Sequence, residues 1–303
     1  MPSDTPIPDA QNREDLLRFI RAWTHRYGIA QRWRRARLTG TVLLSLAGPV
    51  VVLAAPDSGP LLGALAALWT VLARTALGDL EQGNRRRGAG LQEAFDTRLF
   101  GLSWNAPLAG RPPAPEDVDD DADGVDDALL RNWYPAAAGE LVRPLDVLLC
   151  QRSSVVWGRR THTTYAALML ALTTMWWIVG VTIGLLDGLG LDDYLVGLFL
   201  PSLPAFLDAA ELWRAHREQA RTKGLVEQDI DELFAGACAD GRVPELARCR
   251  EFQDRIYLTR RSGPQVPRHF YRFRRDRDEA AMQRGASDIA GGVRVDLRRS
   301  DAC

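Results

Sequence analysis

Residues 165–186 read YAALMLALTTMWWIVGVTIGLL, a run of 22 residues without a charged side chain. At about 1.5 Å of rise per residue, a helix of this length extends about 33 Å, which matches the roughly 30 Å hydrocarbon core of a bilayer. The alternative is a helix of a soluble protein, but such a helix at a surface carries a polar stripe that this run lacks. The stretch therefore predicts a membrane-spanning helix.

Three further apolar stretches share this character. Residues 38–55 read LTGTVLLSLAGPVVVLAA, residues 61–73 read LLGALAALWTVLA, and residues 194–207 read YLVGLFLPSLPAFL. Each stretch lacks charged side chains and is long enough to form much or all of a membrane span. Together with residues 165–186, they predict two transmembrane hairpins, at 38–79 and 165–210, with spans over about 38–55, 61–79, 165–186 and 191–210.

Basic residues lie on one side of all these spans. The connectors within the hairpins, PDSGP at 56–60 and DGLGLDD at 187–193, hold acidic residues and no Lys or Arg. The opposite ends carry Arg32, Arg34, Arg35, Arg37, Arg85, Arg86, Arg87, Arg152, Arg159, Arg160, Arg214, Arg217, Arg221 and Lys223. Because loops that stay in the cytoplasm carry the excess of Lys and Arg, this distribution predicts a multi-pass protein with a cytoplasmic N-terminus, middle region and C-terminus.

The remaining sequence divides into three cytoplasmic regions that we expect to be mostly helical. Residues 1–37 form an amphipathic leader, residues 80–164 an insert, and residues 211–303 a set of C-terminal helices with a loose tail. The helices expected in the last region cover 211–239, 244–261 and 270–282. The expected fold class is therefore mainly α, with four transmembrane helices as two hairpins and a mostly helical cytoplasmic domain built from all three regions.

The composition and motifs exclude several classes of protein. The 303 residues carry 38 Lys and Arg against 39 Asp and Glu, for a formal net charge of −1. The 26 Gly follow no period, which argues against collagen, and the four Cys show no CxxC spacing, which argues against a disulfide scaffold or a local zinc site. No GxSxG, GxGxxG or P-loop motif is present. We therefore expect no catalytic residues, no metal and no cofactor.

An acidic run occupies residues 116–127. Asp119, Asp121 and Asp123 alternate before a glycine, as at the start of a calcium-binding loop. The last ligand position of such a loop needs a bidentate glutamate, and here it holds Leu130. We expect a solvated acidic loop rather than a calcium site.

A basic and aromatic segment covers residues 255–277. It holds eight arginines and one acidic residue, interleaved with Tyr257, Phe270, Tyr271 and Phe273. Arginine forks fit phosphate and aromatic rings stack on bases, so the segment is suited to a nucleotide. Two alternatives stay open, namely contact with an anionic lipid surface and pairing with the acidic run.

Two charged residues lie at the inner ends of predicted spans. Arg74 follows the apolar run at 61–73, and Asp208 follows the run at 194–207. Both spans run inward, which places both charges about 21 Å below the outer edge of the bilayer, in its inner third. Either each side chain snorkels to the cytoplasm by itself, or the two form an intramembrane pair that fixes how the hairpins pack.

Three blocks of sequence carry a resemblance to a known family. They are GLQEAFDTRLFGLSWN at 90–105, NWYP with CQRSSVVWGRRTHTTY within 132–165, and FQDRIYLTRRSGPQVPRHFYRFRRDRDEAAM at 252–282. With two hairpins around a cytoplasmic insert, the chain resembles the SMODS-associating four-transmembrane effector family, which accompanies cyclic-oligonucleotide synthases in bacterial CBASS antiphage systems. The resemblance covers most of the chain, and none of its blocks is a catalytic motif.

The resemblance implies a function and a set of partners. It implies an effector of the bacterial inner membrane that senses a cyclic di- or trinucleotide from a cognate nucleotidyltransferase. The effector then assembles, as a homo-oligomer, and permeabilises the lipid bilayer through a pore or general disruption, causing abortive infection. DNA and RNA are not expected as partners. The alternatives are a membrane-anchored signalling or scaffold protein without pore activity, and a membrane-bound enzyme.

Within the matched blocks, side-chain chemistry selects candidates for the pocket of this activating ligand. The six candidates are Arg152, Trp157, Arg255, Tyr257, Arg260 and Arg261. The arginines would contact phosphate groups, and the two aromatic rings would stack on bases.

Overall fold

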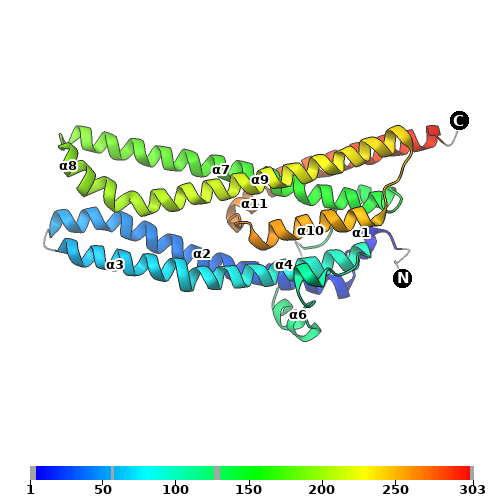
Figure 1. Cartoon of the computed structure of the whole chain (residues 1–303), viewed down its shortest axis with the longest axis horizontal. Coiled ribbons are helices and arrows are strands. Elements are labelled where there is room, and N and C mark those ends of the chain that lie inside the picture. The colour runs from blue at the N-terminus through cyan, green and yellow to red at the C-terminus, as the bar shows by residue number, and fades with distance from the viewer. Residues whose placement is uncertain (1–4, 56–57, 126–129, 301–303) are drawn as a thin grey trace. The chain divides into compact units, whose positions relative to one another are not determined.

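The computed structural model describes residues 5–55, 58–125 and 130–300 of the chain. Within these ranges the regular secondary structure is helical, and no strand occurs. The long helices are α2 (Glu14–Ala54), α4 (Gly78–Phe100), α7 (Leu145–Leu186), α9 (Leu200–Asp240), α10 (Leu246–Ser262) and α11 (Arg268–Ser300) (Figure 1). The expectation of a mainly α fold is therefore confirmed.

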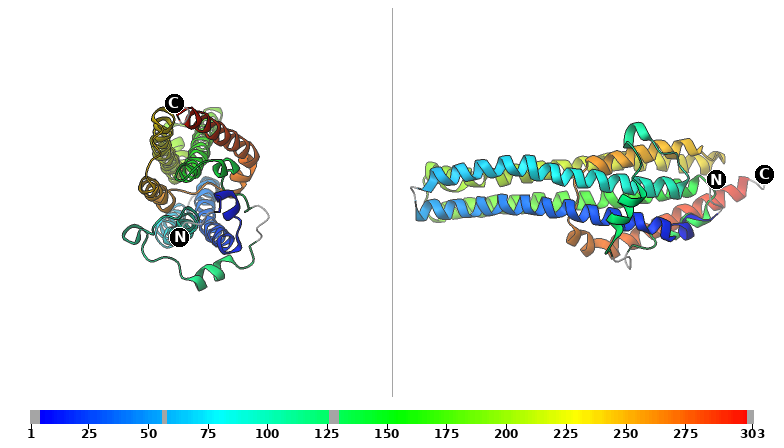
Figure 2. Two further views of the ribbon diagram at one scale, coloured as in Figure 1. Left: turned by 90° about the vertical axis from the view of Figure 1, so that its right-hand side faces the viewer. Right: turned by 90° about the horizontal axis from the view of Figure 1, so that it is seen from below.

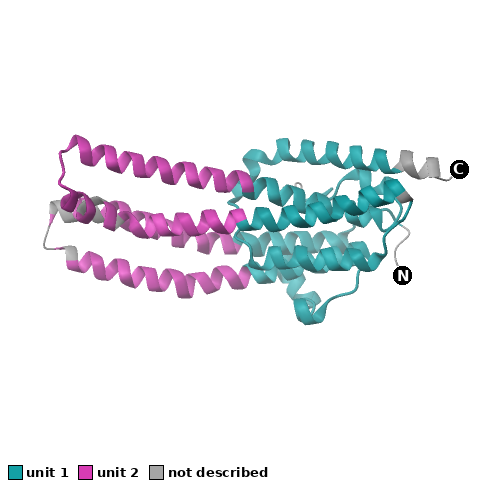
Figure 3. Ribbon diagram, turned by 45° about the horizontal axis from the view of Figure 1, so that its top comes forward, with its two compact units in different colours: residues 1–28, 85–162, 218–303 teal, residues 29–84, 163–217 magenta. Residues whose placement is uncertain are grey.

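The chain forms two compact units from interleaved segments (Figure 3). The polar unit comprises residues 1–28, 85–162 and 218–303, and the apolar unit comprises residues 29–84 and 163–217. The helices α2, α4, α7 and α9 each contribute residues to both units. Each of these four helices is therefore a continuous backbone connection from one unit into the other.

The apolar unit is built from two helical hairpins. In the first, α2 is followed by α3 (Gly59–Leu72), and a π-helical turn, η2 (Ala73–Leu77), leads directly into α4. In the second, α7 is followed by the short α8 (Leu191–Tyr194), and a second π-helical turn, η4 (Leu195–Phe199), leads into α9. Figures 1 and 2 show α2 running beside α3 within this unit. Residues 56–57 of the first connector lie outside the described ranges.

The surface of the apolar unit is covered by large apolar side chains. Val50, Leu68, Trp177 and Leu186 are all more than half exposed. Two helices, over Pro60–Phe100 and Leu145–Leu186, are long and apolar enough to cross a membrane, and only 6% of the most apolar stretch of each is buried. Soluble proteins rarely expose apolar patches of this extent, so the unit has the surface of a protein that meets lipid.

Close helix contacts in this unit depend on small residues. A Cβ atom added to Gly40 in α2 would lie 2.0 Å from Cζ2 of Trp69 in α3. The indole Nε1 of the same Trp69 donates a hydrogen bond of 3.3 Å to Oγ1 of Thr41. In the second hairpin, a Cβ atom on Gly184 would lie 2.8 Å from Cδ2 of Tyr194. Glycine at such positions lets two helices approach closely in an apolar surrounding.

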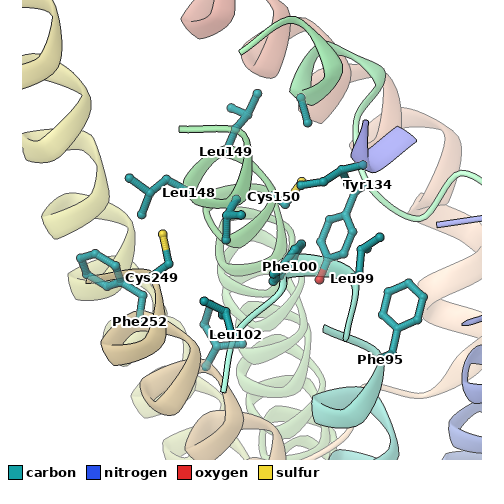
Figure 4. Packing of buried hydrophobic residues seen from close by; sticks show 14 of the residues in the cluster. Phe95, Leu99, Phe100, Leu102, Tyr134, Leu148, Leu149, Cys150, Cys249 and Phe252 are labelled. Atoms are coloured by element: carbon teal, nitrogen blue, oxygen red, sulfur yellow. The ribbon is translucent and has the colours of Figure 1, made fainter. Parts of the chain in front are cut away.

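The polar unit contains the hydrophobic core. It adds to the long helices the short elements α1 (Ile7–Ala10), α5 (Ala106–Ala109), α6 (Pro115–Ala122) and η3 (Ala136–Glu140), and the two helices α10 and α11. Phe95, Phe100, Leu148, Leu149 and Phe252 are fully buried there and pack together with Tyr134 and the two thiols of Cys150 and Cys249 (Figure 4). Helices α4, α7 and α10 thus present their apolar faces to one common core.

The structure differs from the sequence-based expectation at the C-terminus. The expected loose tail is helical, because α11 continues as far as Ser300. Ala286, Ala290 and Val293 are buried at helical spacing and belong to the core of the polar unit. These small apolar residues give α11 a packed face that a search for large apolar side chains overlooks.

Candidate functional site

A buried ion pair lies at the centre of the polar unit. Asp96 on α4 is fully buried, and its Oδ2 accepts a hydrogen bond from Nη1 of Arg260 on α10. The second terminal nitrogen of Arg260 donates to Oγ of Ser154 on α7 over 2.9 Å. Tyr134 donates its hydroxyl hydrogen to Oδ1 of Asp96 over 2.7 Å. These contacts join α4, α7 and α10 through side chains from all three blocks that carry the family resemblance.

The hydrogen bonds of this pair continue into a wider network. Nε2 of Gln253 on α10 donates to Oε2 of Glu93 over 2.8 Å and to Oδ2 of Asp96 over 2.9 Å. Nε2 of Gln151 on α7 donates to Oε1 of Gln253 over 3.1 Å. Arg250 donates to Oε1 of Glu93 over 2.6 Å. We call Glu93, Asp96, Tyr134, Gln151, Ser154, Arg250, Gln253 and Arg260 the buried polar network.

Burial and charge set the protonation of this network. Burial raises the pKa of Glu93, and its hydrogen bond from Gln253 and the charge of Arg250 act in the opposite direction. Burial is the largest single influence on Arg260 and lowers its pKa, but the charge of Asp96, the hydrogen bond to Asp96 and the neighbouring Tyr134 and Tyr27 together raise that pKa above its ordinary value. Burial also raises the pKa of Tyr134, and the neighbouring Asp96 adds to the shift. Arg260 and Asp96 therefore form a charged pair that a neutral tyrosine hydroxyl supports.

Three of the six candidate ligand residues are engaged by carboxylates. Arg260 pairs with Asp96, Arg152 pairs with Asp231, and Arg255 pairs with Asp229. The guanidinium group of Arg152 also lies 3.9 Å from a carboxylate oxygen of Glu227. Both Asp231 and Asp229 lie on α9, so two of these pairs join α9 to α7 and α10.

The other three candidates lie in two places. Arg261 donates from Nη1 to the backbone oxygen of Leu108 over 3.1 Å and hydrogen-bonds to Tyr257, which is buried. Burial raises the pKa of Tyr257, and the positive charges of Arg261 and Arg86 lower it. Trp157 instead packs on Tyr271 with ring centroids 5.5 Å apart. The structure thus does not bring all six candidates into one pocket.

Arg86 and Arg261 are the cations near Tyr257 that carry no carboxylate partner in the part of the chain that the structure describes. Arg86 is exposed and Arg261 is half-buried. Near the buried ring of Tyr257 they form a basic surface, which we call the Tyr257 surface. Its chemistry suits an anionic ligand, because guanidinium groups bind phosphate.

The sequence reasoning missed a buried lysine beside this region. Lys223 on α9 is buried and donates from Nζ to Oγ1 of Thr259 over 3.0 Å. Among the described residues it has no ion pair, and burial together with the charge of Arg260 lowers its pKa from 10.5 to about 7. A Cβ atom on Gly158 of α7 would lie 2.7 Å from Cδ of Lys223. One signal was available, because Lys223 is the single lysine of an arginine-rich chain.

The acidic run is engaged with arginines rather than fully solvated. Residues 116–122 of the run lie in α6, where Asp121 is buried and pairs with Arg26 and with Arg87, the latter over 2.8 Å. Asp119 pairs with Arg18 over 3.1 Å. The expected solvated loop is thus partly wrong, because Asp117, Asp119 and Asp121 pair with arginines of α2 and α4 rather than with residues 255–277. Residues 126–129 lie outside the described ranges.

The structure brings together Arg74 and Asp208, the two charged residues that follow predicted apolar runs. Nη2 of Arg74 donates to Oδ1 of Asp208 over 3.1 Å. Arg74 lies in the π-helical turn η2, and Asp208 lies in α9. Nη1 of Arg74 also lies 3.7 Å from Oε2 of Glu211. The pair links the first helical hairpin of the unit to the second.

The described residues do not form a metal-binding cluster, and two of their cysteines are poor nucleophiles. Among them, no group of three His, Cys, Asp or Glu residues is arranged to hold a metal ion. Cys150 and Cys249 are free and buried, and burial raises the pKa of both thiols, to about 12 for Cys249. A protonated thiol is a poor nucleophile and a poor metal ligand.

These features define the class of protein. Over the described residues its regular secondary structure is helical, two of these helices have the length and composition that cross membranes, and a second, polar unit contains buried ion pairs. The chain belongs to the SMODS-associating 4TM effector domain family, whose model matches residues 5–289. A relative from Bacillus cereus (strain VD146), named a probable CBASS effector molecule, is 23% identical over 285 residues, which cover 90% of this chain and 95% of the relative. No solved structure matches the chain.

Proposed function

We propose that the chain is the membrane effector of a CBASS antiphage system. In this proposal, the polar unit receives a cyclic di- or trinucleotide in the bacterial cytoplasm, and the apolar unit assembles with other copies and permeabilises the inner membrane. The observation that carries the proposal is the family match over residues 5–289, which covers the apolar unit and most of the polar unit. The name of the Bacillus cereus relative agrees with this role.

The proposed topology has four spans in two hairpins, with both termini in the cytoplasm. The apolar unit supports it because its outer surface is apolar and because its two connectors, near residues 55–58 and 187–190, carry no basic residue. Arginines cluster at the opposite ends of the same helices. The Arg74–Asp208 pair would then lie in the inner part of the bilayer, where a charge is costly unless it has a partner.

The Tyr257 surface is our proposed point of first contact for the nucleotide. Arg86 and Arg261 would bind phosphate groups there. Arg261 is next to Arg260 along α10, so a ligand that moves Arg261 acts on the buried polar network. The network includes Asp96 on α4 and Ser154 on α7, and both helices continue into the apolar unit. This continuity offers a route from ligand binding to the membrane.

One observation favours the alternative of a scaffold protein without pore activity. Arg152, Arg255 and Arg260 already have carboxylate partners, as they would in a rigid protein that binds another protein. Co-expression with cyclic-nucleotide synthases distinguishes the two functions. An effector stops growth and loses membrane potential only when an active synthase supplies the nucleotide, whereas a scaffold leaves the membrane potential unchanged with every synthase.

Binding measurements on purified full-length protein test the ligand site itself. We expect Arg261→Ala to weaken binding of the activating nucleotide by about 1.5–3 kcal/mol, the size of a charge-assisted hydrogen bond. Arg284→Ala is the matched control, because Arg284 is an exposed arginine on α11 outside the Tyr257 surface. Equal affinity of the two variants for the nucleotide would contradict the proposed site.

A further inference from the structure

A short segment between α4 and α6 lies against α10 in the polar unit. Residues 105–110 contain α5, and none of these residues is fully buried. Next to them, Trp104 packs partly against the core and donates from Nε1 to the backbone oxygen of Gly110 over 2.8 Å. Segments with few buried apolar contacts open locally at a lower free energy than a core does. We call residues 105–110 the strap.

Two side-chain contacts hold the strap on α10. Nδ2 of Asn105 donates to Oδ2 of Asp254 over 2.9 Å. Nη1 of Arg261 donates to the backbone oxygen of Leu108 over 3.1 Å. Asp254 and Arg261 are seven residues apart on α10, a spacing that places both contacts on one side of the helix. Both contacts are polar, so a charged ligand can compete for their partners.

The second of these contacts engages the Tyr257 surface. Tyr257 follows Asp254 by three residues and precedes Arg261 by four, so its side chain lies on the same side of α10. Arg261 hydrogen-bonds both to Tyr257 and to the backbone oxygen of Leu108. The guanidinium group that would bind phosphate in the proposed function is therefore already engaged by the strap.

We propose that the strap closes the Tyr257 surface and that a phosphate group of the ligand releases it by taking Arg261. The inference rests on the proposed function, since it adds a regulation to the proposed nucleotide site. A phosphate oxygen carries charge, and its hydrogen bond with a guanidinium group is stronger than that of the neutral carbonyl oxygen of Leu108. The phosphate therefore displaces the carbonyl and leaves the strap attached by Asn105 alone.

The strap is also connected to the buried polar network. Asp254, which accepts the hydrogen bond from Asn105, accepts another of 2.6 Å from Nη2 of Arg250. The same nitrogen of Arg250 donates to Oε1 of Glu93 on α4 over 2.6 Å. Release of Asn105 leaves Arg250 as the remaining partner of Asp254 among these contacts. Opening of the strap thus changes a hydrogen-bonded chain that ends on α4.

Nucleotide affinity tests the strap in a way that ordinary structural damage does not imitate. A site that must open before it binds has an apparent affinity lowered by the fraction of molecules that are open. Variants that weaken the closed strap should therefore bind the nucleotide more tightly than the native protein. Damage to a loop that only supports the site would leave the affinity unchanged or weaken it.

Asn105→Asp weakens the closed strap with little other change. The new side chain keeps an oxygen for the backbone N–H of Leu108, which Oδ1 of Asn105 accepts over 3.3 Å. It loses the amide donor and sets a second carboxylate against Asp254. We expect purified full-length protein with this change to bind a cyclic di- or trinucleotide about fivefold more tightly, the effect of one lost hydrogen bond. Adding Asp254→Asn restores a donor to the contact and should return the affinity to the native value.

Gly110→Ala weakens the strap through its backbone. Gly110 has φ 76° and ψ −153°, a region that glycine alone adopts readily, and no atom lies within 4 Å of a Cβ atom added there. The alanine should therefore strain the closed strap without a clash and increase the nucleotide affinity as well. Gly124→Ala is the matched control, because Gly124 also has a positive φ, 68°, and open space for a Cβ atom. It lies outside the strap and should leave the affinity unchanged.

Amide hydrogen exchange of the same full-length protein in detergent follows the opening itself. The amides of Leu108, Ala109 and Gly110 bond to carbonyl oxygens one turn earlier, at Asn105 and Ala106. A single helical turn released from α10 is not stable by itself, so opening should speed exchange at these three amides. We expect faster exchange in Gly110→Ala without nucleotide, and in the native protein when a cyclic di- or trinucleotide that binds is added.

A panel of cyclic di- and trinucleotides decides between the outcomes. Unchanged or weaker affinity in both Asn105→Asp and Gly110→Ala would overturn the strap, and so would slower exchange at residues 108–110 when a nucleotide binds. If Arg261→Ala weakens binding but neither strap variant strengthens it, the Tyr257 surface stands and the strap is wrong. If no nucleotide of the panel binds the native protein or the strap variants, the proposed function and the strap are both wrong.

Discussion

Arg74 and Asp208, which are 134 positions apart in the sequence, form a hydrogen-bonded ion pair of 3.1 Å between the two helical hairpins of the apolar unit. Asp208 is the more enclosed partner, with 15% of its side chain exposed against 52% for Arg74. The carboxylate of Asp208 therefore has little access to solvent and depends more on the ion pair than Arg74 does. If the unit spans the membrane, the pair also fixes the register of one hairpin against the other.

Exchanging the two charges tests the pair. We expect Arg74→Asp and Asp208→Arg each to lower the thermal stability of the detergent-solubilised protein and to reduce growth arrest, because each puts two like charges together at a cost of about 2–3 kcal/mol. The double exchange should restore both properties. Glu211→Ala is the control with little effect, because the Glu211 side chain is 71% exposed and its carboxylate is 3.7 Å from Arg74. If the losses of stability and of growth arrest in the double variant equal the sum of those in the two single variants, Arg74 and Asp208 do not interact.

The buried pair of Asp96 and Arg260 should be the most sensitive ion pair of the polar unit. Asp96→Asn leaves the guanidinium group of Arg260 buried without its countercharge, so we expect a loss of about 3–5 kcal/mol in the free energy of unfolding. Arg248→Ala breaks the exposed pair of Arg248 with Glu251 on the same α10 helix and should cost about 1 kcal/mol or less. Denaturant unfolding followed by tryptophan fluorescence measures both. Similar losses in the two variants would contradict the central role of the buried pair.

Lys223 should make the stability of the polar unit depend on pH. Its pKa is lowered to about 7 in the folded protein, against 10.5 when it is unfolded. Between these values the unfolded chain binds a proton that the folded chain lacks, so stability should rise with pH across this window. Below it, both states are protonated and the cost of burying the charge is present in full. Lys223→Met should raise stability most at low pH and remove the slope in thermal unfolding measured from about pH 6 to about pH 10, a range that covers most of this window.

Lys223→Arg is the comparison for that experiment. An arginine keeps its charge over the whole range, so this variant should also lack the slope but should be less stable than the methionine variant. A slope that persists in the methionine variant would assign the pH dependence to another group.

Cysteine labelling in intact cells tests the proposed topology. Single cysteines at Ser58 and Leu189 lie at the two hairpin connectors, and we expect both to react with a membrane-impermeant reagent added outside. Leu189 is preferable to its neighbour Gly188, whose φ of 64° disfavours any residue with a Cβ atom. A cysteine at the exposed Ser287 should react only after the cells are opened. External labelling at Ser287 would reverse the topology.

The helices were largely predictable from the sequence, because apolar periodicity and long uncharged runs have a direct physical cause. The expected helix over 244–261 corresponds to α10 (Leu246–Ser262). The sequence predicts an amphipathic leader ahead of the first apolar stretch, and the structure joins the two in one helix, α2. No helix-breaking residue stands at the junction between those two segments, so one helix carries both the polar and the apolar side chains.

The candidate site was predictable only by residue type. Arginines and aromatic residues in the matched blocks fit a nucleotide by their chemistry. In the structure, however, Arg152, Arg255 and Arg260 form ion pairs with carboxylates from other helices. Pairing of this kind depends on contacts over long sequence distances, such as the 164 positions between Asp96 and Arg260. A single sequence carries no local signal for such pairs, and the same holds for the buried Lys223.

Dye release from liposomes tests the central claim most directly. Full-length protein is reconstituted in phosphatidylcholine and phosphatidylglycerol liposomes that contain a self-quenched dye, and a panel of cyclic di- and trinucleotides is added. Nucleotide-gated permeabilisation predicts that at least one nucleotide releases the dye rapidly, that linear nucleotides do not, and that Arg261→Ala shifts the response to higher nucleotide concentration. If no nucleotide of the panel releases dye from liposomes that hold inserted protein, the chain does not act as a cyclic-nucleotide-gated membrane effector.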